Sequence, residues 1–155
     1  MHRHILIPTD GSALSQAAVE YGIALAKSVG AKVTLLTVSA PFHTFAVEQV
    51  VTDTPERYAK QVAELAKNYL DAAKEVALAA GMSCETMHVE HDYPYLAIIE
   101  TAAKKSCDLI VMASHGRRGI SAVMLGSETS KVLTHSGIPV LVVRPPSRPF
   151  FSVES

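Results

Sequence analysis

The amino-acid sequence predicts a single α/β domain built on an open five-stranded parallel sheet with helices on both faces. Short apolar segments alternate with long segments of helical periodicity, which is typical of α/β sheets. Most of the short segments are rich in Val, Ile and Leu without polar alternation, as expected for strands covered on both faces. The chain has 155 residues, of which 48% are hydrophobic, and this is enough for one domain with a substantial core.

Five segments are predicted to be strands, and four of them are apolar enough for the interior of a sheet. The third differs, because Met87 and Val89 alternate with polar residues as in an edge or half-exposed strand. The predicted strands are His4 to Pro8, Val33 to Val38, roughly Cys84 to Glu90, Leu109 to Ala113 and Val140 to Val143.

Four helices are predicted between the strands, from apolar residues at three- and four-residue spacing and from their end signals. Residues 40–53 show no clear period and are predicted to form a loop. The predicted helices run from Ser12 or Ser15 to Gly30, from about Thr54 to Gly81, from Pro94 to Lys105 and from Ser127 to His135.

The charge balance argues against several classes of partner. The chain has 14 Lys and Arg against 15 Asp and Glu, a formal net charge of −1 at pH 7. Nonspecific binding to nucleic acid or to a membrane surface needs a large basic excess, so neither partner is expected. The segment before the first strand is too short for a signal-peptide core or a membrane span, so we expect a cytoplasmic location.

A glycine-containing loop after the fourth predicted strand indicates a ligand site. Glycines between Ser114 and Gly119 let backbone N–H groups approach a phosphate without a Cβ in the way. Gly126 and Ser127 then open a helix, whose unpaired N–H groups and dipole favour negative charge. Together, the strand, the glycine loop and the helix start predict a nucleotide-binding site.

Asp10 follows the first predicted strand, and ligands of such sheets bind beyond the carboxyl ends of the strands. Its carboxylate could accept hydrogen bonds from a ribose hydroxyl or an adenine amino group, or hold Mg²⁺ through water. The alternative is that Asp10 and Ser12 only cap the first helix. The two roles are compatible.

Efficient catalysis is not expected. The chain lacks the Gly-x4-Gly-Lys-Ser/Thr loop of fast NTPases, and no residue is evidently placed to activate water, so hydrolysis is expected to be slow at most. We interpret His115 as shaping its loop, because no catalytic partner can be assigned to it. The pairs His2 with His4 and His88 with Glu90 fall short of a full metal-ligand set, so no metal site is predicted from them.

Four motifs occur together at characteristic spacings. They are Pro8-Thr9-Asp10-Gly11-Ser12, the segment from Asp108 to Gly119, Leu125-Gly126-Ser127, and Pro139 followed by Val140-Leu141-Val142-Val143.

In these motifs the chain resembles a universal stress protein of the single-domain type, over about residues 1–144. The resemblance implies a sheet in the order 3-2-1-4-5, four helices, and a homodimer formed through the last strand, here Val140, Leu141, Val142 and Val143. A Pro-rich tail, residues 145–155, follows the expected domain and includes Phe150 and Phe151. The tail is a candidate for docking onto the dimer or a partner.

The ATP-binding branch of that family carries Gly-x2-Gly-x9-Gly-Ser/Thr, and this chain has Ala113-x2-Gly116-x9-Gly126-Ser127. Ala113 thus replaces the first glycine. Its methyl group could crowd the ribose or adenine, or could be accommodated if the backbone is in an ordinary β conformation.

The resemblance also implies a cofactor and its contacts. The cofactor would be ATP, with Mg²⁺, and Ala113 would stand at the first motif position. Pro8, Thr9, Asp10 and Val38 would surround the base and ribose, while Gly116, Gly126, Ser127 and the N–H of Glu128 would hold phosphates. Arg117 and Arg118 are placed to add charge-assisted contacts, and the alternative is that they belong to a solvated loop.

Two functions remain open at this point. The first is an ATP-binding regulatory protein of stress adaptation, a dimer that acts as a nucleotide-dependent switch. The alternative is a nucleotide-independent dimeric interaction module, in which Ala113 marks the loss of binding and residues 42–51 contact an unknown protein partner.

Overall fold

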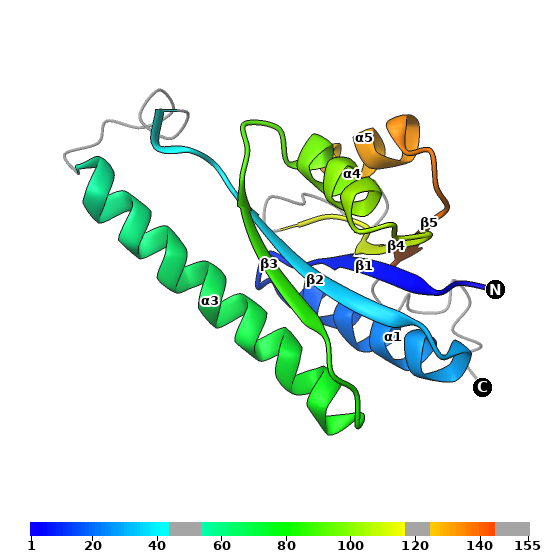
Figure 1. The fold of residues 1–155 in the computed structure, drawn as a ribbon. Helices are drawn as coiled ribbons and strands as arrows, with labels where there is room; N and C mark the ends of the chain where they lie inside the picture. Colours follow the sequence, from blue (N-terminus) through cyan, green and yellow to red (C-terminus); the bar gives the residue numbers. More distant parts are fainter. Residues whose placement is uncertain (44–53, 117–124, 145–155) are drawn as a thin grey trace, which may run out of the picture.

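The computed structural model describes residues 1–43, 54–116 and 125–144. Most of the predicted loop at 40–53, Arg117 and Arg118, and the tail at 145–155 lie outside the described residues. The elements follow one another as in Figure 1, in the order β1 (His4–Pro8), α1 (Ala13–Val29), β2 (Lys32–Ser39), α3 (Pro55–Ala79), β3 (Glu85–Glu90), α4 (Pro94–Lys104), β4 (Leu109–Ala113), α5 (Ser127–His135) and β5 (Val140–Val143).

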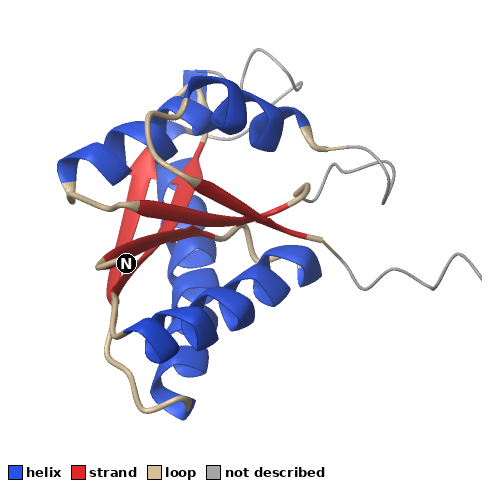
Figure 2. Ribbon diagram, turned by 90° about the vertical axis from the view of Figure 1, so that its right-hand side faces the viewer, coloured by secondary structure: helices blue, strands red, loops and turns tan. Residues whose placement is uncertain are grey.

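The five strands form one parallel sheet in the order β3-β2-β1-β4-β5, which confirms the predicted topology. Helices α1 and α3 cover one face, and α4 and α5 cover the other (Figures 1 and 2). Because all strands are parallel, their carboxyl ends share one edge. The strand order reverses between β1 and β4, and ligands of such sheets bind at this position.

Two apolar layers hold the helices to the sheet. Ile5 and Ile7 of β1 face the α1 and α3 side, where they join residues such as Val19 and Ile23, whereas Leu6 faces the α4 and α5 side. The side chains of Ile5, Leu6 and Ile7 are all fully buried. The apolar segment Ile5-Leu6-Ile7 therefore belongs to a central strand that is covered on both faces, as predicted.

The strand ends differ slightly from the predicted ones. Strand β2 is one residue longer at each end, because Lys32 pairs with His4 of β1 and Ser39 pairs with Glu90 of β3. Neither added residue carries an apolar signal, so hydrophobic periodicity could not include it. Strand β3 lies at a sheet edge and is half-exposed, as its alternating pattern predicted.

The helix ends use the expected caps. Ser12, and not Ser15, is the N-cap of α1, since its hydroxyl accepts a hydrogen bond from the Ser15 N–H at 3.2 Å. Gly30 ends the helix at φ +73°, a conformation that favours glycine. Within the described residues, no helix is both long and apolar enough to cross a lipid bilayer.

Candidate functional site

Asp10 lies between the start of α1 and the loop that follows β4. Its Oδ1 accepts a hydrogen bond from the N–H of Ser12, the N-cap residue of α1, at 2.9 Å. On the other side, a Cβ added to Gly116 would lie 2.5 Å from Asp10 Oδ2. Glycine at position 116 thus allows the β4 loop to lie directly against this carboxylate. The structure brings these two predicted site residues together.

Thr9 is buried, and its polar atoms are used within the protein. Its N–H donates to the Leu36 carbonyl at 2.8 Å, and its own carbonyl accepts from the Thr37 hydroxyl at 2.9 Å. The Thr9 hydroxyl lies 3.1 Å from the Ser15 hydroxyl. Thr9 and Pro8, the last residue of β1, therefore hold the turn that positions Asp10.

Val38 presents its peptide atoms to the same edge. In a parallel ladder, alternate residues direct their N–H and C=O to the same neighbouring strand. Leu36 bonds toward β1, through Thr9, whereas the Ser39 carbonyl accepts from the His91 N–H on the β3 side. Val38 therefore directs one donor and one acceptor toward the space beyond the last residue of β1.

Ala113 is accommodated without strain. It is the last residue of β4, pairs with Val143 and is buried. Its carbonyl accepts a hydrogen bond from the Thr129 hydroxyl of α5 at 2.9 Å. Because the residue lies in an extended strand, its backbone does not require glycine.

Helix α5 begins where a side chain would not fit. The Gly126 N–H donates to the Ser114 carbonyl at 2.7 Å, and a Cβ at this position would lie 2.9 Å from both Cα and Cβ of His115. Gly126 is the N-cap and has no side-chain hydrogen bond to the first turn. The first N–H groups of α5, including that of Ser127, thus lie at the sheet edge without a side-chain cap.

The Glu128 side chain is hydrogen-bonded to a different helix, α4. Its Oε2 accepts a hydrogen bond from the Tyr95 N–H in the first turn of α4 at 2.9 Å, and its Oε1 lies 3.6 Å from Lys131 Nζ. The carboxylate is therefore engaged with α4, and only the backbone N–H of Glu128 is suited to an anion. His115 is buried with Nδ1 3.2 Å from the Ser114 hydroxyl, which agrees with its interpretation as a loop-shaping residue.

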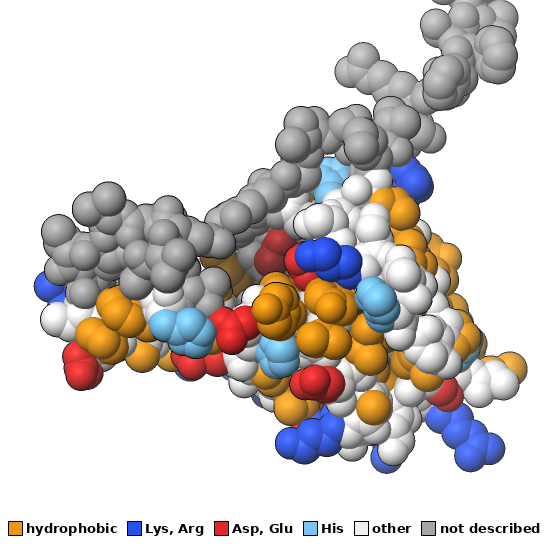
Figure 3. Space-filling model, turned by 90° about the horizontal axis from the view of Figure 1, so that it is seen from above, with side chains coloured by type: hydrophobic (Ala, Val, Ile, Leu, Met, Phe, Trp, Pro, Cys, Tyr) orange, Lys and Arg blue, Asp and Glu red, His pale blue; other side chains and the backbone are white. Residues whose placement is uncertain are grey.

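Aromatic rings lie around the hydrogen bond between Glu128 and Tyr95, on the outer face of α4 and α5. The Tyr95 ring lies 5.5 Å from the His135 ring and 6.5 Å from the Tyr93 ring, and Lys131 Nζ lies 5.5 Å from the Tyr95 ring centroid. Figure 3 looks at the molecule from above these helices and shows hydrophobic and histidine side chains gathered on this face.

Sequence analysis missed a cavity of about 240 Å³ between the end of β2 and α3. Asp10 and Val38 contribute to it, but much of its wall comes from Tyr58, Ala66 and Tyr69 of α3. With Val62, which also lines the cavity, Tyr58, Ala66 and Tyr69 follow one another at four-, four- and three-residue spacing, so the pattern places them on one helix face. That face was recognisable in the sequence, but its position beside the strand ends was not.

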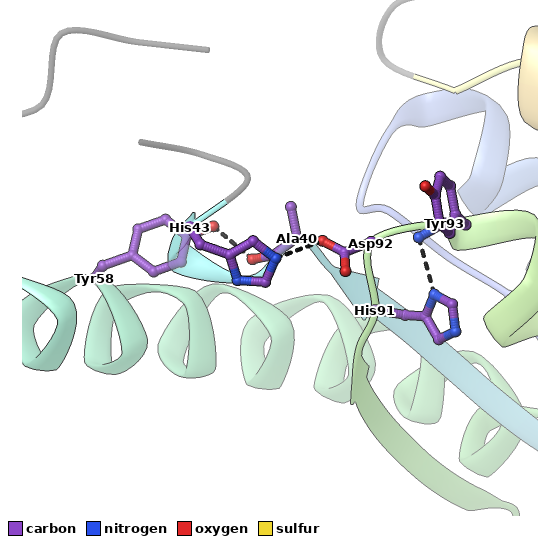
Figure 4. A network of polar contacts seen from close by, with 6 residues as sticks. All are labelled: Ala40, His43, Tyr58, His91, Asp92 and Tyr93. Carbon is purple, nitrogen blue, oxygen red and sulfur yellow. Dashed lines mark hydrogen bonds and ion pairs between the residues drawn. The ribbon is translucent and has the colours of Figure 1, made fainter. Parts of the chain in front are cut away.

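Residues 40–43 are held on two sides, as Figure 4 shows. The Tyr58 hydroxyl donates to the Ala40 carbonyl at 2.7 Å, and His43 Nε2 lies 2.9 Å from Asp92 Oδ1 in the segment after β3. Burial, together with the charge of Glu90, raises the pKa of Tyr58. Its hydroxyl therefore remains a donor at neutral pH.

A sequence model of the universal stress protein family matches residues 1–144. The chain belongs to this family. It is similar to universal stress protein MJ0531 of Methanocaldococcus jannaschii, with 33% identity over 150 residues, 96% of this chain and 85% of the relative. The solved structure of MJ0577, from the same organism, has a TM-score of 0.80 and 28% identity over 96% of this chain and 99% of that one. A universal stress protein solved in complex with cAMP is similar, with a TM-score of 0.65 and 26% identity over 92% and 97% of the two chains.

Removing the hydrogen bond from Thr129 to Ala113 tests how α5 is held to the sheet. Replacing Thr129 with Val leaves the buried carbonyl without its side-chain donor and should lower the free energy of unfolding by about 1–3 kcal/mol. Thr134→Val is the matched control, because Thr134 is exposed on the same helix and also donates to a backbone carbonyl. Urea unfolding measures both. Equal losses in the two variants would contradict the account.

Proposed function

We propose that this protein is an ATP-binding regulatory protein of stress adaptation, which acts in the cytoplasm as a nucleotide-dependent switch. One observation carries the proposal: Gly126 approaches the end of β4 so closely that a side chain is excluded, and the uncapped start of α5 lies there beside Gly116. Backbone N–H groups that converge at a helix N-terminus favour the phosphates of a nucleotide. The proposed domain spans residues 1–144, with 145–155 as a Pro-rich tail.

Each site residue has a proposed role. Asp10 and Val38 contact the ribose and base, and Pro8 and Thr9 position them. The phosphates contact Gly116, Gly126, Ser127, the N–H of Glu128 and Arg117, with Ala113 as part of the wall.

Adenine is the base that we propose. The similar universal stress protein in complex with cAMP supports an adenine nucleotide as the class of ligand. The N–H and C=O that Val38 directs into the edge also complement adenine, whose N6 amino group donates and whose ring nitrogens accept.

Magnesium is proposed because of charge. Asp10 Oδ2 lies against Gly116, so phosphates held by the loop would approach a carboxylate. A divalent cation reduces this repulsion, and Mg²⁺ usually keeps several waters and binds through carboxylates and phosphates. Asp10 would then hold Mg²⁺ through a water molecule.

A role as a nucleotide-dependent switch fits this sequence better than rapid ATP hydrolysis. The chain has no lysine-containing phosphate loop of the fast NTPases, and no residue is assigned to activate water, so we propose hydrolysis that is slow at most.

The variant Gly126→Val tests the phosphate site. The added side chain would collide with His115 and displace the β4 loop, so ATP affinity should fall at least about tenfold, which corresponds to ~1.4 kcal/mol. Gly137→Val is the control, because a Cβ at Gly137 meets no atom within 4 Å. Calorimetric titration of nucleotide-stripped protein gives both affinities. Intact affinity in Gly126→Val would place the phosphates elsewhere, and no ATP binding by the wild type would favour the nucleotide-independent interaction module.

We further propose a homodimer through β5. Strand β5 forms one edge of the sheet and pairs with β4, and its four residues, Val140, Leu141, Val142 and Val143, are each half-buried. An apolar edge strand is a template for pairing with another chain, and a second copy would cover it. Sedimentation at micromolar concentration should show a dimer. A stable monomer would contradict the proposal.

A further inference from the structure

Tyr95 is the residue in the first turn of α4 whose backbone N–H takes an acceptor from another helix. The first helical residue is a proline, which has no N–H, and the N–H groups of Leu96 and Ala97 both donate to the Tyr93 carbonyl, at 3.1 and 3.2 Å. The N-cap residue Tyr93 makes no side-chain capping bond. The Tyr95 N–H donates instead to Glu128 Oε2 at 2.9 Å. A residue of α5 thus completes the first turn of α4.

Glu128 belongs to the turn of α5 that is proposed to hold the phosphates. Its own N–H lies in the uncapped first turn, two residues after Gly126. Its carboxylate extends from that turn to α4, and Oε1 also lies 3.6 Å from Lys131 Nζ. The backbone of Glu128 therefore serves the proposed phosphate site, whereas its side chain holds the start of the neighbouring helix.

Tyr95 connects this hydrogen bond to the surface of the molecule. Its ring lies 5.5 Å from the His135 ring and 6.5 Å from the ring of Tyr93, which is 57% exposed. Lys131 Nζ lies 5.5 Å from the centroid of the Tyr95 ring. Helices α4 and α5 lie side by side over one face of the sheet (Figure 1). A change at the bond between Glu128 and Tyr95 therefore reaches side chains that a partner could contact.

We propose that Glu128 is a positioning residue that couples phosphate binding at the start of α5 to the start of α4. The inference rests on the proposed function, and it assigns the surface of Tyr93, Tyr95 and His135 as the part of the protein that responds to the nucleotide. Phosphates that accept hydrogen bonds from the first turn of α5 hold that turn in one geometry, so the Glu128 carboxylate separates less often from the Tyr95 N–H. Because coupling is reciprocal, the bond to Tyr95 strengthens phosphate binding by the same factor.

Amide hydrogen exchange of the wild type tests the coupling without any substitution. Exchange of the Tyr95 N–H should slow at least about fivefold with saturating ATP or inorganic tripolyphosphate, and it should stay unchanged with adenosine, which has no phosphates. The Met82 N–H is the control, because it donates to the Ala77 carbonyl at 2.9 Å near the opposite edge of the sheet. Equal slowing at both amides would indicate general stabilisation and would overturn the inference.

Two substitutions at Glu128 isolate the hydrogen bond from the charge. Glu128→Gln and Glu128→Ala both remove the negative charge, but only glutamine keeps an oxygen that can accept from the Tyr95 N–H. Calorimetric titration should show that Glu128→Gln binds ATP at least about fivefold more tightly than Glu128→Ala, and ATP should slow Tyr95 exchange only in the glutamine variant. Lys131→Met is the control, because it removes the ion pair and leaves the bond to Tyr95, so ATP should still slow Tyr95 exchange.

The outcomes separate this inference from the proposed function. If the wild type binds ATP without slower exchange at Tyr95, or if the two Glu128 variants bind ATP equally well, the inference is overturned and the proposed function stands. If the wild type binds neither ATP nor tripolyphosphate, the proposed function fails as well.

Discussion

The close approach of α5 to the end of β4 is the contact on which the rest of the candidate site depends. The Gly126 N–H bonds to the Ser114 carbonyl at 2.7 Å, and no side chain fits between the helix start and His115. Thr129 strengthens the contact by donating to the Ala113 carbonyl. Because the Gly126 bond joins two backbone atoms, the first N–H groups of α5 lie at a defined place along the sheet edge.

The topology of the sheet brings this helix start to the rest of the site. Strand β1 lies between β2 and β4, so Asp10 lies beside Gly116 on one side and close to Val38 on the other. Asp10 therefore holds the N-cap residue of α1 and borders both the phosphate loop and the cavity. The Glu128 carboxylate is bonded to α4, which removes a negative side chain from the uncapped turn of α5.

Local sequence signals predicted the fold well, since buried parallel strands are short apolar segments and helices carry caps such as Ser12 and Gly30. The glycines of the β4 loop were also visible, because their spacing is a property of the sequence. Contacts between distant segments were not, as with Asp10 against Gly116 and Tyr69 over Gly11. Periodicity assigned the tyrosines of α3 to a helix, but it carries no information on which strand end they cover.

The central claim is that the nucleotide binds at the carboxyl edge of the sheet, and NMR titration of ¹⁵N-labelled protein with ATP and Mg²⁺ tests it most directly. We expect the largest shifts at the backbone N–H groups of Gly116, Gly126, Ser127 and Val38, with small changes at the opposite edge, such as at Lys32 and Leu109. Shifts concentrated at the opposite edge, or saturation with ATP without change at Gly126 and Ser127, would contradict the account.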